Sequence, residues 1–82
     1  MSDSKQMTLR QMQTGQSGIL VQIQGGRGLF NRLSALGVRP GKRITKVSSM
    51  VMRGPVTIQL DNAQLAIGFG MANRIIVKLE EP

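Results

Sequence analysis

Short runs of alternating apolar and polar residues, separated by turns that contain glycine or asparagine, are the main feature of this chain of 82 residues. A period of two is typical of β-strands that bury one face. A chain of this length hides only about 60% of the surface that its unfolded form exposes, so it supports one modest core. The pattern therefore predicts a single, mainly β domain that forms a small β-barrel.

Five segments carry the strand pattern. In the first, Ile19, Val21 and Ile23 alternate with the residues between them, which is the period of a half-buried strand. The second is rich in β-branched residues but does not keep one alternation, which indicates a bulge or bend. A turn at residues 61–62 is expected to join two later strands into a hairpin. The expected strands cover residues 17–24, 42–51, 56–61, 65–67 and 75–79.

One short α-helix is expected between the first two strands. Leu29, Leu33 and Leu36 recur at i, i+4 and i+7, so they predict an apolar stripe that faces inward, with Phe30 beside it. Residues 68–73 contain too much glycine for a long helix, and we expect one helical turn there, just before the last strand.

A cap defines the end of this helix. Gly37 fits the left-handed position of a Schellman motif, which would bring Val38 into contact with Leu33. Pro40 then prevents the helix from continuing, and the next segment starts at Gly41.

The chain is expected to form one domain without a linker. Residues 1–7 are predicted to be a disordered tail, residues 8–79 the domain and residues 80–82 a C-terminal stub. The absence of cysteine suits a reducing compartment. The first ten residues lack the apolar centre of a signal peptide, and no apolar run is long enough to cross a membrane. We therefore expect a soluble, cytoplasmic protein.

Positive charge dominates the body of the domain. The formal net charge is +7, and between residues 5 and 78 the only acid is Asp61. Such a field attracts nucleic acid, an anionic membrane surface or an acidic protein. Part of this charge is expected to form a basic face around the helix and its exit, which serves either as a solvated rim or as a contact surface. Its members would be Arg27, Arg32, Arg39, Lys42, Arg43 and Lys46.

Residue types needed for catalysis and metal binding are missing. The chain has neither histidine nor cysteine, and three of its four acids lie at the ends. This excludes the common general bases, thiol nucleophiles and nitrogen or sulfur ligands for transition metals. We expect no enzymatic activity, no metal site and no cofactor. Met50 and Met52 are the only closely spaced thioethers, and they are better explained as core or contact residues than as copper ligands.

The segment from Arg32 to Ile44 carries the most specific pattern in the chain. It contains Arg-Leu at 32–33, Leu-Gly at 36–37 and Pro-Gly at 40–41, followed by Ile44. Gly54, Pro55 and Ala72 follow later, in matching order. This arrangement resembles the signature of the ferrous iron transport protein A (FeoA) family, over about residues 8 to 79.

The resemblance implies an SH3-like barrel and a role in bacterial ferrous iron uptake. Members of the family are associated with transition metal ion binding, and they act in the cytoplasm on the membrane GTPase that carries the iron, ferrous iron transport protein B. Because this chain lacks metal-ligating residues, a regulatory protein–protein contact is the better hypothesis than iron transfer. The family pattern expects structural roles for Leu33, Leu36, Gly37, Pro40, Gly41, Gly54, Pro55 and Ala72.

Two regions are expected to make the partner contact. The basic helix exit would steer the domain toward an acidic face of the GTPase or the anionic inner face of the membrane. The tip of the hairpin at residues 50–55 would supply apolar anchors, unless Met50 and Val51 enter the core. The contact residues would then be Arg32, Arg39, Lys42, Arg43, Met50, Met52 and Arg53.

An alternative function is phosphate-mediated binding of nucleic acid by a small basic barrel. Single-strand binding needs aromatic platforms, and the chain offers only Phe30 and Phe69, so nucleic acid is the less favoured partner. The chain is expected to be a monomer or a weak dimer, because unpaired edge strands permit association.

Overall fold

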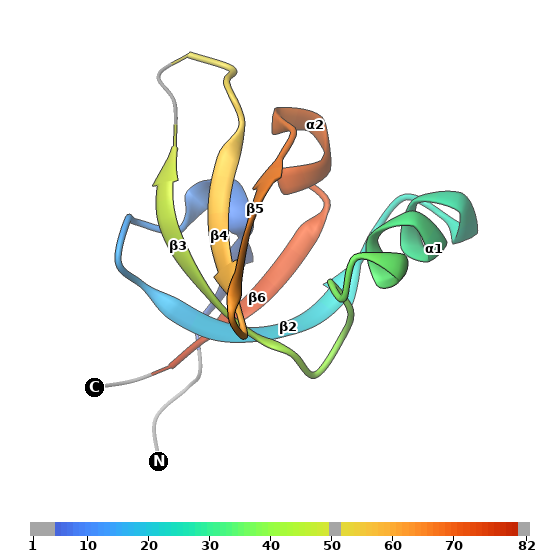
Figure 1. The fold of residues 1–82 in the computed structure, drawn as a ribbon, viewed down its shortest axis with the longest axis horizontal. Helices are drawn as coiled ribbons and strands as arrows, with labels where there is room; N and C mark the ends of the chain where they lie inside the picture. Colours follow the sequence, from blue (N-terminus) through green and yellow to red (C-terminus); the bar gives the residue numbers. More distant parts are fainter. Residues whose placement is uncertain (1–4, 50–51, 81–82) are drawn as a thin grey trace.

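The computed structural model describes residues 5–49 and 52–80 (Figure 1). Six strands, two short α-helices and one 3₁₀ helix make up this part of the chain. In sequence order they are β1 (Gln6–Thr8), η1 (Leu9–Gln11), β2 (Ser17–Ile23), α1 (Arg27–Ala35), β3 (Arg43–Ser49), β4 (Val56–Leu60), β5 (Ala63–Ile67), α2 (Phe69–Ala72) and β6 (Ile75–Leu79).

The strands form one antiparallel sheet in the order β1-β6-β2-β3-β4-β5. The sheet bends strongly, so that β2 curves beneath the upright strands β3, β4 and β5 (Figure 1). The expectation of a mainly β barrel with one inserted helix and a helical turn before the last strand is confirmed.

The predicted N-terminal boundary needs correction. Met7 pairs with Val77, and Gln6 pairs with Lys78, so strand β1 begins inside the expected tail. A capping box at Thr8 and Gln11 then starts η1. The sequence reasoning missed this strand because three residues are too few to show an alternation.

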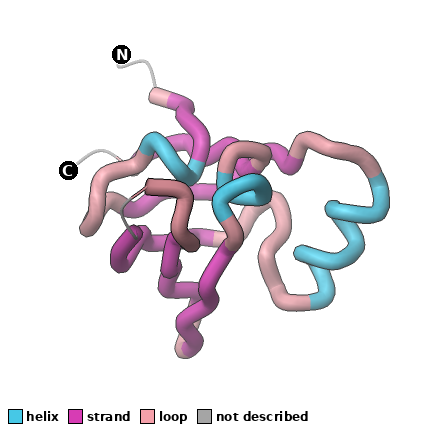
Figure 2. Tube along the Cα trace, turned by 90° about the horizontal axis from the view of Figure 1, so that it is seen from above, coloured by secondary structure: helices cyan, strands magenta, loops and turns pink. Residues whose placement is uncertain are grey.

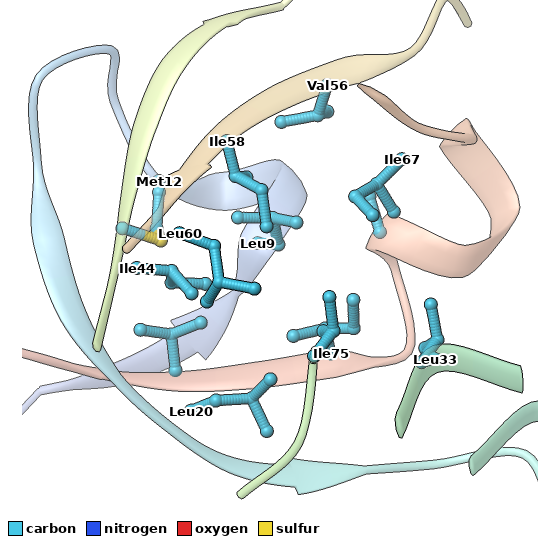
Figure 3. Packing of buried hydrophobic residues seen from close by; sticks show 13 residues of the cluster. Leu9, Met12, Leu20, Leu33, Ile44, Val56, Ile58, Leu60, Ile67 and Ile75 are labelled. Carbon is cyan, nitrogen blue, oxygen red and sulfur yellow. The ribbon is translucent and has the colours of Figure 1, made fainter. Parts of the chain in front are cut away.

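The core lies inside the bend of the sheet (Figure 3). Strand β4 alternates as predicted, because Val56, Ile58 and Leu60 are buried and the residues between them are half-buried. In β2 the fully buried side chain is Leu20, while Ile19, Val21 and Ile23 are half-buried. The core comprises Leu9, Met12, Leu20, Leu33, Val38, Ile44, Val56, Ile58, Leu60, Ile67, Ala72, Ile75 and Val77.

Two expected irregularities are present. The pairing of β3 with β4 shifts its register between Lys46 and Ser48, which confirms the bulge in β3. The hairpin of β4 and β5 closes through the turn at residues 61–62, where Asp61 adopts a φ of +55°. Aspartate tolerates this left-handed conformation better than most residues, so the turn sets the register of the pair.

Helix α1 ends in the predicted Schellman cap. The Val38 N–H donates to the Leu33 carbonyl at 2.9 Å, and the Gly37 N–H donates to the Ser34 carbonyl at 2.9 Å. Gly37 has a φ of +90°, as this motif requires. Leu33 and Val38 are both fully buried, so the cap also joins α1 to the core.

The predicted inward stripe of α1 is only partly correct. Leu33 is buried and Leu29 packs partly against the core, but Leu36 is 54% exposed and Phe30 is 38% exposed. Figure 2 shows why: α1 stands to one side of the sheet instead of lying across it. A helix that touches the barrel along so narrow a line buries only the middle of its apolar stripe.

Candidate partner-binding surface

Helix α1 and its exit expose both basic and apolar side chains. Arg27, Arg32 and Arg39 are exposed, and Leu36 and Phe30 lie on the same element or at its cap. We call these five residues the α1 surface. Protein contact surfaces often combine such residues. The basic side chains attract an acidic partner, and the apolar side chains form the part of the interface that excludes water.

Lys42 and Arg43 are engaged within the chain. The Lys42 Nζ lies 2.8 Å from the Asp61 Oδ2, and the Arg43 Nε lies 2.6 Å from the Glu80 Oε2. The hydrogen bond from Arg43 lowers the pKa of the Glu80 carboxyl, and the same contact raises the pKa of Arg43. These pairs neutralise two of the predicted contact charges. They also correct the prediction of a stub at residue 80, because Glu80 is tied to β3.

Lys46 does not belong to the predicted basic face. Its side chain is only 3% exposed, and its Nζ donates to the backbone carbonyls of Arg10, at 2.9 Å, and of Met12. Burial, followed by the nearby charge of Arg10, lowers the pKa of Lys46. The residue alternates inward on β3, and it holds η1 against that strand instead of meeting a partner.

In the described part of the hairpin tip between β3 and β4, Met52 is an exposed apolar side chain. Met52 is 90% exposed and adopts a φ of +65°, and Arg53 beside it is also exposed. Gly54 is half-buried and Pro55 is exposed. The question whether Met50 and Val51 enter the core lies outside the described residues.

The remaining residues of the family pattern lie in a turn and in α2. Gly41 has a φ of +95°, and its N–H donates to the Leu20 carbonyl at 2.8 Å, so the Pro-Gly turn attaches the exit of α1 to β2. Pro40 is exposed at this turn, and Ala72 is buried in α2.

A pocket that the sequence did not reveal lies where the β3–β4 turn, η1 and α2 meet. The Arg10 Nε donates to the Asn73 Oδ1 at 2.9 Å, and the Arg10 Cζ lies 5.3 Å from the centroid of the Phe69 ring. These residues are far apart in sequence, so no local signal could have found the pair. We call the site the Arg10 pocket; its lining consists of Arg10, Ser49, Met52, Gly54, Val56 and Phe69.

Within residues 5–49 and 52–80, no three His, Cys, Asp or Glu side chains are grouped so that they could hold a metal ion. No helix in that part of the chain is both long and apolar enough to cross a bilayer.

The fold and the exposed side chains of the α1 surface define a small barrel of the SH3-like class with a candidate contact surface. The model of the FeoA domain family matches residues 7–79. The chain therefore belongs to the FeoA family. A protein named Fe(2+) transport protein A from Campylobacter jejuni is 29% identical to this chain over 73 residues, which cover 89% of this chain and 99% of that protein.

Solved structures confirm the fold. A crystal structure of an iron uptake regulatory protein, FeoA, is 34% identical to the chain and superposes with a TM-score of 0.84, covering 93% of this chain and 99% of the other. The zinc complex of FeoA from Stenotrophomonas maltophilia is 22% identical, with a TM-score of 0.74 and coverage of 88% and 89%. That protein is described as a prokaryotic SH3 domain protein, and at this identity the likeness concerns the fold alone.

Proposed function

We propose that this chain is a non-enzymatic accessory protein of ferrous iron uptake that acts in the cytoplasm, by direct contact with the membrane GTPase iron transporter. Membership of a family associated with ferrous iron transport supports the process. The observation that carries the proposed mode of action is the α1 surface, where one short helix and its exit expose three arginines together with Leu36 and Phe30.

The structure changes which charges can do the steering. Lys42 and Arg43 each face a carboxylate at hydrogen-bond distance, so their fields largely cancel at long range. Arg32 and Arg39 form no ion pair with a carboxylate of residues 5–49 or 52–80, and both are exposed. We therefore assign the steering role to these two residues, with Leu36 as the apolar anchor beside them.

Charge reversal at the α1 surface tests this assignment. The double variant R32E/R39E should associate with the soluble GTPase portion of the transporter about tenfold more slowly at low salt, because steering acts on the encounter rate. The difference should shrink when salt shortens the Debye length. Stopped-flow association measured at two salt concentrations gives both numbers.

The matched control is K5E/K78E, which changes the net charge equally at exposed residues near β1 and on β6. Equal slowing in both double variants would show that only net charge matters and would reject the α1 surface. Absence of wild-type binding to the GTPase portion would contradict the proposed function itself. Salt-steep binding to mixed RNA and DNA duplexes, or to anionic vesicles, in place of the GTPase would identify a different partner.

A further inference from the structure

The Arg10 pocket is separate from the α1 surface and is unused by the proposed function. It is a concavity of about 160 Å³ that is lined by residues of η1, α2, β3, β4 and the turn between β3 and β4. Val56 is buried, Phe69 is half-buried and Met52 is exposed. A volume of this size holds the end of one side chain.

The guanidinium of Arg10 is oriented before any ligand arrives. One edge is fixed, because its Nε donates to the Asn73 Oδ1 at 2.9 Å. One face is also fixed, since its Cζ lies 5.3 Å from the Phe69 ring centroid, within the range of a cation–π contact. The N–H groups of the two Nη atoms have no partner among residues 5–49 and 52–80. An arginine in this state offers a preformed fork for two acceptor oxygens.

Among residues 5–49 and 52–80, no carboxylate forms an ion pair with this fork. In the described part of the chain, the two ion pairs join Asp61 to Lys42 and Glu80 to Arg43, and neither reaches Arg10. The buried ammonium of Lys46 is bound to the carbonyl of Arg10 itself, at 2.9 Å. Burial first, and then the charge of Arg10, lowers the pKa of Lys46. The exposed Arg53 stands in the sequence between Met52 and Gly54, which both line the pocket.

We propose that the Arg10 pocket binds the carboxylate of one glutamate or aspartate side chain presented by a partner protein. The two carboxylate oxygens would accept from the Arg10 Nη groups, in the bidentate geometry that suits this pair. Val56 and Met52 would contact the methylene groups behind the carboxylate and an apolar neighbour in the partner. This inference goes beyond the proposed function and does not depend on the identity of the transporter.

The same geometry disfavours nucleic acid as the occupant. A nucleic acid chain needs several cations along a groove together with free aromatic faces for its bases. Here one guanidinium lines the pocket, and Arg10 itself covers a face of the Phe69 ring. A single planar anion next to apolar contacts therefore fits the site better than a phosphodiester backbone.

A peptide titration tests the proposal on the full chain. The probe is an acetylated and amidated hexapeptide with one glutamate between leucines, and the matched peptide has glutamine in its place. We expect saturable NMR shift changes at the Arg10 Nε–H, Gly54 and Phe69 with the glutamate peptide. The glutamine peptide should bind about tenfold more weakly, because its uncharged amide offers the guanidinium a single acceptor oxygen in place of two carboxylate oxygens.

Three variants separate the guanidinium from general charge. Arg10→Gln should weaken glutamate-peptide binding about tenfold, and Arg10→Lys should weaken it nearly as much, because lysine keeps the charge but loses the fork. Lys78→Gln, which removes one positive charge at an exposed residue on β6, should leave the affinity unchanged. The side chain of Arg10 is exposed, and Lys46 binds only its carbonyl, so both Arg10 variants should fold.

Several outcomes would overturn the proposal: no saturable binding of the glutamate peptide, equal affinity for the glutamine peptide, or an unchanged affinity in Arg10→Gln. Inorganic phosphate that displaces the peptide and binds more tightly would assign the pocket to phosphate instead. If Arg10→Gln failed to fold, Arg10→Lys and the comparison of the two peptides on the wild type would still decide. Failure of the transporter experiment leaves this test unaffected, so the two proposals can fail separately.

Discussion

At the scale of single residues, Lys46 shows how a charge that looks like part of a surface can become part of the core. Its ammonium replaces water with two backbone carbonyls, those of Arg10 and Met12. Those carbonyls lie in and just after η1, whose 3₁₀ turn leaves them without other partners in the described hydrogen bonds. Burial of the charge is therefore tolerated because it satisfies acceptors that would otherwise be lost.

The lowered pKa of Lys46 makes stability depend on pH in a specific direction. Between its folded-state value and the ordinary lysine value of about 10.4, the unfolded chain binds the proton more tightly than the folded chain. The Lys46 contribution to stability should therefore rise as pH increases through that interval and stay flat below it. Denaturant unfolding of wild type and Lys46→Met, from about pH 8 to about pH 10.5, measures the difference. The free energy of unfolding of the wild type, minus that of Lys46→Met, should increase with pH. If this difference falls or stays constant, the pKa of Lys46 is not lowered by burial.

The Arg10 pocket belongs to the same scale, and it could not be derived from the sequence. Asn73 and Phe69 meet Arg10 only because η1 and α2 pack together at one end of the barrel. No sequence pattern around Arg10 or Asn73 predicts their contact, whereas the alternation of apolar and polar residues predicts which side chains of β4 are buried. Side-chain sites that join distant segments depend on packing that no periodicity encodes.

At the scale of elements, the sequence predicts local structure correctly where a residue type has a strong backbone preference. Gly37 is the clearest case, because the positive φ and both hydrogen bonds of the cap match the sequence expectation. The exposure of Leu36 and Phe30 was not predictable in this way, since the period of three to four residues shows that a stripe exists but not how much of it is covered.

Substitution of Gly37 tests the cap. Gly37→Val should lower the free energy of unfolding by about 1–2 kcal/mol, because a β-branched residue is strained at positive φ. Its Cβ would also approach the Leu60 side chain to 3.3 Å. Gly28→Val is the matched control, because Gly28 is helical and a Cβ there meets no atom within 4 Å. A melting temperature that is lowered equally in both variants would count against the cap as the cause.

At the scale of the whole molecule, the segments at both ends of the domain bond to the sheet. Strand β1 pairs with β6, the Leu79 N–H donates to the Lys5 carbonyl at 2.8 Å, and Leu9 directly after β1 is fully buried. Glu80 adds its contact with Arg43 on β3 at the other end. The sequence predicts a tail and a stub at these ends, but both take part in the fold. Short polar segments do not specify a strand by themselves, and here the strands beside them fix their conformation.

Removal of β1 should therefore destabilise the entire domain, not only its N-terminus. A chain that starts at Leu9 loses the ladder with β6, the half-buried Met7 and the cap of η1 at Thr8. At about 1 kcal/mol for each net hydrogen bond and a similar amount for Met7, the loss is about 3 kcal/mol. Small domains have a total stability of roughly 5 kcal/mol at the lower end, so a large part of that stability would be lost.

The comparison is a chain that starts at Lys5, which keeps β1 intact. Thermal unfolding followed by circular dichroism measures both, and a truncated chain that melts at the same temperature as the comparison would mean that β1 pairs with the sheet without supporting it.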